Sequence, residues 1–262
     1  MTDAPAAIAD IKLWYHTFDL PAGVVTPGLF DHRKVVGKLP FPDSLAGKRC
    51  LDLASADGFF AFEMARRGGD VVSVDLENPQ GRDWQGEAPP DQTSTGARRR
   101  FERVRELTGL EVDRRDMNLY DVSPEALGGK FDFVFMGNVL LHVSDPSRVL
   151  RNVRSVTDGN FLCFETISMT LTAMRPLWAA AALSVGHESR WWTPNLRAHR
   201  RLLEATGFEI VDGGFPLFQP FGPGTSKRPE VPIWKAPKPS KWLYFWLAGR
   251  WIGVPSAWTL CR

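Results

Sequence analysis

A short apolar segment that runs into a turn of small residues constrains the fold of this chain more than any other part of its sequence. Arg49–Leu53 forms the segment and Ala54–Gly58 forms the turn. A helical stretch follows, and Val71–Asp75 is a second apolar segment that ends in an acid. Strand, turn, helix and strand make up the nucleotide-binding half of a βαβ unit, in which the acid accepts hydrogen bonds from a ribose. The chain is therefore predicted to bind an adenosine-containing ligand, with Asp75 at the ribose.

Strands and helices alternate along the rest of the chain. Phe131–Met136 is almost continuously apolar, as expected of a strand buried on both faces. The expected strands cover residues 49–53, 71–75, 111–115, 131–136, 161–166, 208–211 and 256–261. The expected helices cover residues 8–16, 59–67, a stretch ending at Gly109, 145–159 and 193–207. The pattern predicts an α/β fold with a doubly wound, Rossmann-like, seven-stranded and mostly parallel sheet, whose last strands allow an antiparallel edge.

Two regions are expected to lie outside this sheet. Residues 1–46 contain Gly23, Pro27 and Gly28, which interrupt regular structure, and are interpreted as an N-terminal lid or cap. Residues 47–262 would form the Rossmann-like domain, with two insertions that build the acceptor pocket. The first, at about 168–192, forms a cap after the fifth strand, and the second lies at about 215–250. Trp242–Trp258 is apolar but too short to span a membrane, and Arg250 splits it, so a packed amphipathic cap is expected.

Composition indicates which binding partners and which cellular compartment to expect. The 262 residues carry a net charge of +2, which indicates no strong attraction to nucleic acid or to an anionic membrane. The three cysteines are far apart and lack metal-ligand spacing, which is typical of a reduced cytoplasm. The first residues contain no apolar signal segment. The expectation is a cytoplasmic protein with a small-molecule partner, without a membrane span and compatible with a homodimer.

The first turn discriminates between adenosine cofactors. Dinucleotide enzymes use glycines there, so that the backbone can approach a pyrophosphate. In this chain Ala54, Ala56 and Asp57 would crowd or repel a phosphate, and only Gly58 remains. S-adenosylmethionine has no phosphate, and its positive sulfonium and zwitterionic end suit an acidic turn. The pattern favours S-adenosylmethionine over NAD.

The predicted cofactor contacts lie beyond the carboxyl ends of four strands, where ligands bind in such sheets. Asp75 would accept from the ribose hydroxyls, the residues after the third strand would flank the adenine, and Asn138 would face the methionine portion. The full predicted set is Asp52, Ala54, Ser55, Gly58, Asp75, Leu76, Asp116, Met117, Asn118 and Asn138.

These residues resemble class I S-adenosylmethionine-dependent methyltransferases. The resemblance is carried by Leu51–Met64, Phe135–His142, Asp145-Pro146 and Phe164–Thr166. Trp14–Thr17 and Gly23–Gly28 make the chain similar, more narrowly, to the tRNA wobble-uridine enzymes that form carboxymethoxy- and methoxyuridine. The similarity covers about residues 11–212 and implies methyl transfer from S-adenosylmethionine, with S-adenosylhomocysteine as product.

Two observations make nucleic acid an unlikely substrate class within that resemblance. The tRNA enzymes carry a longer region ahead of the first strand, where this chain has fewer than 50 residues. The basic run Arg98–Arg100 is followed by Glu102 and Glu106 on the same helix, which indicates a solvated helix face. A small acceptor is therefore favoured over RNA.

Methyl transfer to a hydroxyl benefits from a base that removes its proton. His142 is the first candidate, because it follows Asn138 by about one helical turn where cofactor and acceptor would meet. Glu165 ends the fifth strand and would orient His142, bind a substrate hydroxyl or ligate a cation; His16 is a third candidate. His142 and Glu165 are also the candidate ligands for Mg²⁺, although no spacing requires a metal.

Aromatic residues suggest the acceptor pocket. Ten tryptophans against three tyrosines is an unusual ratio, and indole faces bind flat apolar surfaces, including the CH-rich faces of sugars. The predicted substrate-binding residues are Trp14, Tyr15, His16, Trp191 and Trp192, with Trp178 nearby. The structural alternatives are tryptophans in the core, a packed histidine at position 142 and a salt-bridged carboxylate at position 165.

Three functions remain as hypotheses. The leading one is an O-methyltransferase that acts on a hydroxyl of a sugar or glycoside, or of another secondary metabolite. The second is a tRNA wobble-uridine modification enzyme, and the third is an S-adenosylmethionine-binding module without catalytic activity. RNA binding depends steeply on salt, so tRNA binding in a salt series separates the first two.

Overall fold

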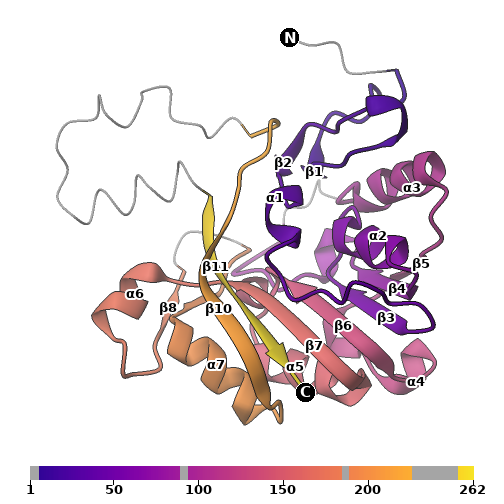
Figure 1. Cartoon of the computed structure of the whole chain (residues 1–262). Coiled ribbons are helices and arrows are strands. Elements are labelled where there is room, and N and C mark those ends of the chain that lie inside the picture. Colours follow the sequence, from indigo (N-terminus) through magenta and orange to yellow (C-terminus); the bar gives the residue numbers. More distant parts are fainter. Residues whose placement is uncertain (1–5, 89–93, 185–188, 226–252) are drawn as a thin grey trace, which may run out of the picture.

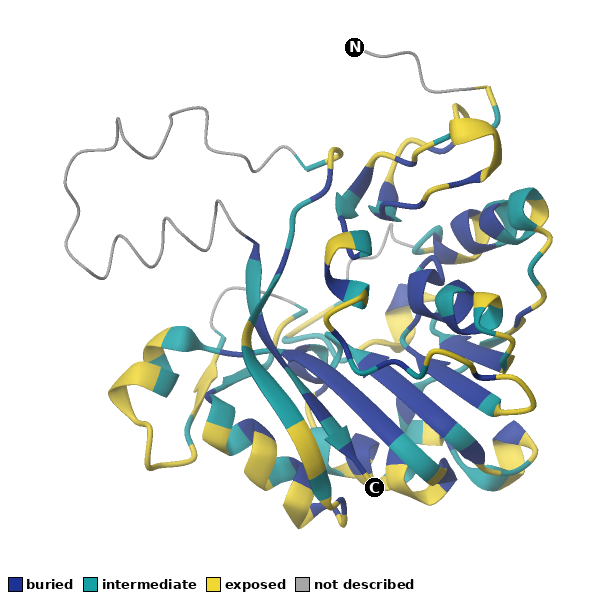
Figure 2. Ribbon diagram, viewed as in Figure 1, coloured by how far each residue is buried: buried dark blue, intermediate teal, exposed yellow. Residues whose placement is uncertain are grey.

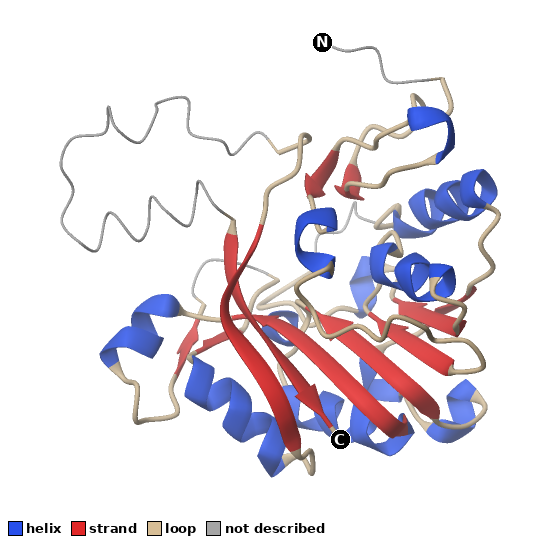
Figure 3. Ribbon diagram, viewed as in Figure 1, coloured by secondary structure: helices blue, strands red, loops and turns tan. Residues whose placement is uncertain are grey.

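The computed structural model describes residues 6–88, 94–184, 189–225 and 253–262. Its centre is a seven-stranded sheet with the order β10-β11-β7-β6-β3-β4-β5 (Figure 3). The strands are β3 Arg49–Leu53, β4 Asp70–Asp75, β5 Asp113–Asp116, β6 Phe131–Gly137, β7 Thr157–Thr166, β10 Ile210–Gln219 and β11 Val254–Cys261. Neighbours from β5 to β7 are parallel, whereas β11 is antiparallel to both β7 and β10. The predicted fold class, including the antiparallel edge, is confirmed.

Helices cover both faces of the sheet (Figure 1). The helices on one face are α2 Phe59–Arg66 and α3 Ala97–Thr108, and those on the other are α4 Pro124–Leu127, α5 Pro146–Val156 and α7 Leu196–Ala205. Strand β6 contributes to both cores, because Phe133 and Phe135 pack on the α2 side and Val134 and Met136 on the α5 side. Figure 2 shows the resulting layers, with buried strands between helices whose outer faces are exposed. The continuous apolar run predicted this double burial correctly.

The N-terminal segment packs over α2 and α3 on the same side of the sheet (Figure 1). Its elements are β1 Trp14–His16, η1 Pro21–Gly23, β2 Gly28–Phe30 and α1 Arg33–Val36, with β1 and β2 parallel. The expected helix at residues 8–16 is wrong, because Trp14 and His16 are both buried while Tyr15 is only partly buried, which is the period of a strand. The segment shares one apolar core with α2 and α3.

The basic run on α3 anchors this segment. Arg99 and Arg103 both pair with Asp10, and Arg103 also donates to the carbonyl of Ala7. Arg100 is buried, so the predicted solvated face holds only in part. The arginines that resembled an RNA-binding run are used to fasten the N-terminal segment to the domain.

The insertion after β7 contains α6 Met169–Met174 and a hairpin of β8 Ala181–Leu183 and β9 Trp192–Pro194. Residues 193–194 therefore belong to a strand, and α7 begins at Leu196, where the Asn195 side chain caps it by accepting from the Ala198 N–H at 2.8 Å. The predicted helix after Asp145 ends at Val156, and Gly159 lies inside β7.

The end of one further strand differs from the prediction. Strand β10 continues to Gln219, well past the expected end at residue 211. The short 3-10 turns are η2 Pro79–Gly81, η3 Leu119–Asp121 and η4 Leu140–His142. Most of the predicted insertion at 215–250 and of the apolar stretch 242–258 lies outside the described residues. Among the helices in the described ranges, none has the length and apolarity needed to cross a membrane.

Candidate active site

A cavity of about 400 Å³ lies at the carboxyl ends of β3, β4, β5 and β6. Ligands bind at this edge in doubly wound sheets. Eleven of the predicted site residues line it: Tyr15, His16, Asp52, Ala54, Ser55, Asp75, Leu76, Met117, Asn118, Asn138 and His142. The cofactor end and the acceptor end predicted from sequence therefore belong to one continuous space.

The turn after β3 has a glycine-like backbone built from alanines. Ala54 and Ala56 adopt φ values of 58° and 51°, in the left-handed region where glycine is usual. The Asp75 carboxylate holds the turn by accepting from the N–H of Ala56, and it also accepts from the N–H of Leu76 at 2.7 Å. The backbone of the turn therefore has the conformation of a nucleotide-binding loop, although its side chains are alanine methyl groups. Non-glycine residues held in the left-handed region are typical of functional sites.

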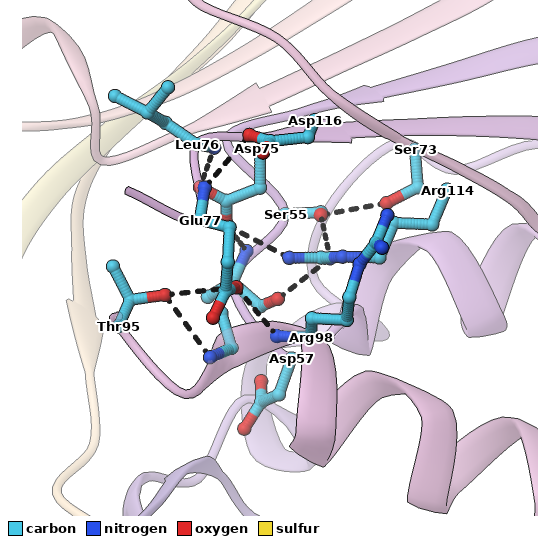
Figure 4. A network of polar contacts seen from close by, with 12 residues as sticks. Ser55, Asp57, Ser73, Asp75, Leu76, Glu77, Thr95, Arg98, Arg114 and Asp116 are labelled. Carbon is cyan, nitrogen blue, oxygen red and sulfur yellow. Dashed lines mark hydrogen bonds and ion pairs between the residues drawn. The ribbon is translucent and has the colours of Figure 1, made fainter. Parts of the chain in front are cut away.

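Arg114 clamps this turn from below (Figure 4). Its Nη1 donates to Ser55 Oγ at 3.1 Å and to the Ala56 carbonyl at 3.0 Å, and its guanidinium lies 4.8 Å from the Phe101 ring centroid. Ser73 adds a hydrogen bond of 2.7 Å to Ser55. Burial lowers the pKa of Arg114, although Asp75, 3.9 Å away, opposes this shift. Arg114 was not predicted from the sequence, since an arginine in a polar edge strand is usually exposed.

Asp116 shapes the neighbouring loop instead of lining the cavity as enclosed by the described residues (Figure 4). Its Oδ1 accepts from the Glu77 N–H at 3.0 Å. The Glu77 carboxylate in turn accepts from the Arg98 N–H at 3.0 Å and from the Thr95 hydroxyl at 3.3 Å, next to the start of α3. Asp116 therefore helps to fix the loop between β4 and α3, and its expected contact with adenine stays a prediction.

The residues at the donor end fit S-adenosylmethionine. Asp52 is buried at the cavity wall, and its Oδ2 has no hydrogen-bond partner within the described chain, which suits a cationic amino group. Burial raises the pKa of Asp52 well above its ordinary value, so a cation there would favour the ionised form. Leu76, Met117 and Asn118 line the far side and offer an apolar and amide surface for a base.

The turn after β6 is held by Glu165. Asn138 adopts a φ of 54°, and its Oδ1 accepts from the Thr166 hydroxyl at 2.7 Å. Glu165 Oε1 accepts from the N–H groups of Val139 at 3.0 Å and Leu140 at 3.2 Å. Burial raises the pKa of Glu165 to about 8, although the two backbone hydrogen bonds oppose that shift. Its side chain is not part of the cavity wall formed by the described residues, so it holds the turn that leads to His142.

His142 lines the cavity with one ring nitrogen occupied. Its Nδ1 donates to the carbonyl of Ser189, so the neutral ring carries its lone pair on Nε2. Burial lowers the pKa of His142, and the nearby Arg190 and Arg82 lower it further, against the effect of the Ser189 hydrogen bond. The imidazole is therefore kept neutral near pH 7, with Nε2 free to accept a hydrogen bond.

His16 forms a pair with Asp57, a residue of the first turn. Asp57 is fully buried, and its Oδ1 accepts from His16 Nδ1, while Oδ2 accepts from the backbone N–H groups of His16 at 2.9 Å and Tyr15 at 3.0 Å. Burial on its own would raise the pKa of Asp57, but His16 and then Arg100 outweigh it and lower the pKa. Asp57 thus fastens the N-terminal segment, and its charge is directed at His16 rather than at a cofactor.

His32 and Gln219 are among the cavity residues that the sequence analysis missed. His32, at the N-terminus of α1, pairs through Nε2 with Gln219 Oε1 at 2.9 Å, and Gln219 donates to Ser256 Oγ at 2.7 Å. Burial lowers the pKa of His32 to about 3, and the nearby His16 acts in the same direction, so the ring is neutral. Gln219 was not predicted because it lies past the expected end of its strand at residue 211. His32 was not predicted because no local sequence pattern indicates a role for it.

The tryptophans predicted to bind substrate lie elsewhere. Trp14 is fully buried in the apolar core beside Phe18. The indole N–H of Trp191 donates to the Asp83 carbonyl at 3.0 Å, and that of Trp192 to the Ser144 carbonyl at 3.2 Å. Trp191 borders an open hollow beside the cavity. Trp178 is 71% exposed.

Gly58 also has a packing role. A Cβ at Gly58 would lie 2.5 Å from the Phe101 ring, so the core alone requires glycine there, and the expected cofactor contact of Gly58 stays a prediction. For the metal hypothesis, no group of three or more His, Cys, Asp or Glu side chains within the described ranges could hold an ion. The prediction of Mg²⁺ at His142 and Glu165 thus has no support from the geometry.

The strand order, the turn after β3 and the acids at the cavity define a Rossmann-like methyltransferase of class I. Residues 33–212 match the family model described as a methyltransferase domain. This match spans more than half of the chain, and the chain belongs to that family.

Relatives and solved structures agree with this assignment. The chain is 30% identical over 125 residues to the ubiquinone biosynthesis O-methyltransferase of Acinetobacter baylyi, covering 47% of this chain and 45% of the relative. It is 27% identical over 189 residues to the enzyme of that name from a Caulobacter species, covering 71% of this chain and 65% of the relative. The chain thus spans about half to two thirds of the length of these relatives.

Two solved structures share the fold. A putative S-adenosylmethionine-dependent methyltransferase from Listeria monocytogenes matches with a TM-score of 0.53 and 13% identity, covering 88% of this chain and 96% of that chain. The 1,6-didemethyltoxoflavin-N1-methyltransferase from Burkholderia thailandensis matches with a TM-score of 0.50 and 16% identity, covering 82% of this chain and 70% of that chain. The similarity to the wobble-uridine group finds no counterpart among these matches.

Proposed function

We propose that this enzyme transfers the methyl group of S-adenosylmethionine to the hydroxyl oxygen of a small acceptor. The observation that carries the proposal is that two imidazoles, His142 and His16, line the cavity with Nδ1 held by a protein oxygen. Each leaves Nε2 to interact with an acceptor hydroxyl. An oxygen nucleophile needs its proton removed, and neutral imidazole is suited to hydrogen-bond or accept it near neutral pH.

An aromatic hydroxyl is the acceptor class that we favour. The carbohydrate prediction rested on tryptophans, and these lie in the core or outside the cavity wall formed by the described residues. The cavity wall instead offers the rings of Phe60 and Phe135 together with Leu13, which suit a flat apolar ring. The relatives named for ubiquinone biosynthesis support the same class. Sugars and other metabolites remain competing acceptors in the test.

His142 is proposed to bind the acceptor hydroxyl, and Glu165 to position His142. The Glu165 carboxylate holds the N–H groups at the start of η4, the turn that carries His142. The proposed cofactor contacts are the cavity-lining acids and turn residues, with Asp52 at the amino group and Asp75 at the ribose. S-adenosylmethionine supplies an activated methyl group when bound, and the surrounding residues orient the acceptor against it.

The test is methyl transfer from isotopically labelled S-adenosylmethionine to panels of phenols and catechols, sugars and glycosides, and bulk tRNA. Mass spectrometry of the products should show oxygen methylation in the aromatic panel. Methylation of tRNA with tight, salt-sensitive binding would overturn the proposal, as would methylation only at nitrogen or carbon. Binding of S-adenosylhomocysteine with no turnover on any panel would favour the non-catalytic alternative.

His142→Gln tests the acceptor contact. Loss of one hydrogen bond to the bound hydroxyl should lower kcat/KM for the acceptor roughly fivefold, since such a bond contributes about 1 kcal/mol. Affinity for S-adenosylhomocysteine should not change. His199→Gln is the matched control, because His199 is also buried but bonds to Thr259 away from the cavity.

A further inference from the structure

We infer that His16, oriented by Asp57, is the residue that takes the proton from the acceptor hydroxyl, whereas His142 only binds that hydroxyl. The inference rests on the proposed hydroxyl acceptor. It assigns a catalytic role to a residue of the N-terminal segment, far in sequence from the cofactor turn. Asp57 acts through His16 and is a positioning residue.

The geometry of His16 is that of an oriented base. Its Nδ1 donates to a fully buried carboxylate, which fixes the ring and the tautomer. Asp57 is itself fixed, because its other oxygen accepts from two backbone N–H groups at 2.9 and 3.0 Å. Nε2 forms no hydrogen bond within the described residues, and it is not among the buried atoms without partners, so it is accessible from the cavity that His16 lines. Base, orienting acid and open site form the arrangement used by enzymes that activate hydroxyls.

The partners of the two histidines decide between them. When an imidazole accepts a proton it becomes a cation, and a buried carboxylate on its other nitrogen stabilises that cation. His16 has such a carboxylate in Asp57. His142 has only the neutral carbonyl of Ser189, and the guanidinium groups of Arg190 and Arg82 disfavour a positive charge on it. Proton uptake is therefore easier at His16.

The surroundings of His16 are otherwise low in charge. From α2 the rings of Phe59 and Phe60 pack against it, with ring centroids at 5.5 and 6.2 Å. From α1 the neutral His32 lies 4.8 Å away, and from α3 the Arg100 Nε is 3.9 Å from the far oxygen of Asp57. Tyr15 follows on the same strand, and burial raises its pKa to about 12, so it is uncharged. Arg100 therefore shares the Asp57 charge with His16, and the burial of this pair limits solvent screening.

The step balances without a further reactant. The acceptor O–H bond breaks, its proton moves to His16 Nε2, and the oxygen electron pair forms the new O–CH₃ bond. The bond between the donor sulfur and the methyl carbon breaks, and the sulfonium becomes a neutral thioether. The imidazolium stays paired with Asp57 until it releases the proton to solvent, so one proton leaves per turnover.

The test uses a series of substituted phenols of decreasing pKa with the full-length enzyme. His16→Gln should lower kcat about 100-fold for the least acidic phenol, the usual size of a general-base contribution. Phenols already ionised at the assay pH need no base, and the variant should turn them over at close to the wild-type rate. Affinity for S-adenosylhomocysteine, measured by calorimetry, should be unchanged. A merely structural role for His16 would lower all rates equally, and that result would overturn the inference.

A second measurement does not depend on the variant folding. In the wild-type enzyme, general-base catalysis predicts a weak dependence of kcat on phenol pKa and an acid limb in the pH profile that is the same for every phenol. If the acid limb instead follows the pKa of each phenol, the phenolate is taken directly from solvent and the inference is wrong. Absence of hydroxyl methylation in the wild type would instead refute the proposed function, so the two failures are distinguishable.

Discussion

The turns after β3 and β6 follow neighbouring strands and have similar backbone conformations. They differ in the group that bonds to the nearby histidine, which is His16 at the first turn and His142 at the second. Each contains a non-glycine residue in the left-handed region, Ala56 and Asn138. Each also has backbone N–H groups held by an acid, the partly buried Asp75 and the buried Glu165. In the first turn a second acid, Asp57, is available for a histidine. In the second turn the Glu165 oxygens are engaged with backbone N–H groups, and His142 is bonded to a carbonyl.

The difference shows that a buried carboxylate near a histidine is not enough to define a base. What matters is whether the carboxylate contacts the ring, because only then can it stabilise the protonated form. Sequence position favoured Glu165, at the end of β7, and His142, which follows the adjacent strand β6. The contacts favour Asp57 and His16, which come from segments 41 residues apart.

Asp57→Asn should have the largest effect on this comparison. An amide cannot accept the three hydrogen bonds that Asp57 accepts from Tyr15 and His16. We expect kcat to fall on the order of 100-fold for a weakly acidic acceptor, and the free energy of unfolding to fall by about 3 kcal/mol, as for other broken buried pairs. Steady-state kinetics and urea denaturation check this. Equal or greater losses in Glu165→Gln would reverse the order of importance of the two turns.

Arg114→Met should have the second-largest effect, and this effect should fall on cofactor affinity rather than on kcat. Removing the charged donor leaves Ser55 Oγ and the Ala56 carbonyl without their clamp. A charged hydrogen bond contributes about 2 kcal/mol, so S-adenosylhomocysteine should bind roughly 30-fold more weakly by calorimetry. At saturating cofactor kcat should be nearly unchanged. Arg115→Met, at a neighbouring position that pairs with Asp113 on the surface, is the control and should change neither quantity.

Glu165 and Asp57 should give stability opposite dependences on pH. Burial raises the pKa of Glu165 to about 8 from 4.5, so the folded protein keeps a proton that the unfolded chain has lost. Its contribution is complete below pH 4.5 and is lost as the pH rises through 8, at about 1 kcal/mol per pH unit. The lowered pKa of Asp57 acts the other way, and its contribution is lost in acid. In denaturation at several pH values, Glu165→Gln should flatten the decline between pH 4.5 and about 8; an unchanged decline would contradict this assignment.

Ala56→Gly should have the smallest effect. Glycine relieves the left-handed backbone, but it also gives the unfolded chain more freedom, and the two contributions oppose each other. We expect the free energy of unfolding to change by less than about 1 kcal/mol. Asn138→Gly is the parallel change in the second turn and should behave similarly, since asparagine tolerates this conformation. A large loss in either variant would show that its side chain, rather than its backbone, is required.

The donor half of the enzyme could be predicted because its signals are local. Strand β3 was predicted with its observed bounds, and Asp52 and Asp75 line the cavity as expected. A strand, a turn and an acid follow each other within a few residues, so the sequence itself orders them in space. The acceptor half is assembled from segments that are distant in sequence, and no local pattern reports such contacts.

Three residues illustrate what escaped prediction. Trp14 was predicted to line the pocket, but the alternation of side chains along β1 places it in the core. Tyr15, the next residue, lines the cavity. Gln219 joins the site only because β10 runs far beyond its predicted end. Asp57 was read as a charge facing the cofactor, whereas it faces the N-terminal segment. In each case tertiary packing, not local propensity, decided the direction of the side chain.

Strand β11 has a consequence for biosynthesis. Its Ser256 holds Gln219, which in turn holds His32 beside His16, so the wall at this end of the cavity depends on residues made about 200 positions after the cofactor turn. Because chains emerge from the ribosome N-terminus first, the donor half can form while the other half is still being synthesised. The nascent enzyme would then be able to hold its methyl donor before it can select an acceptor.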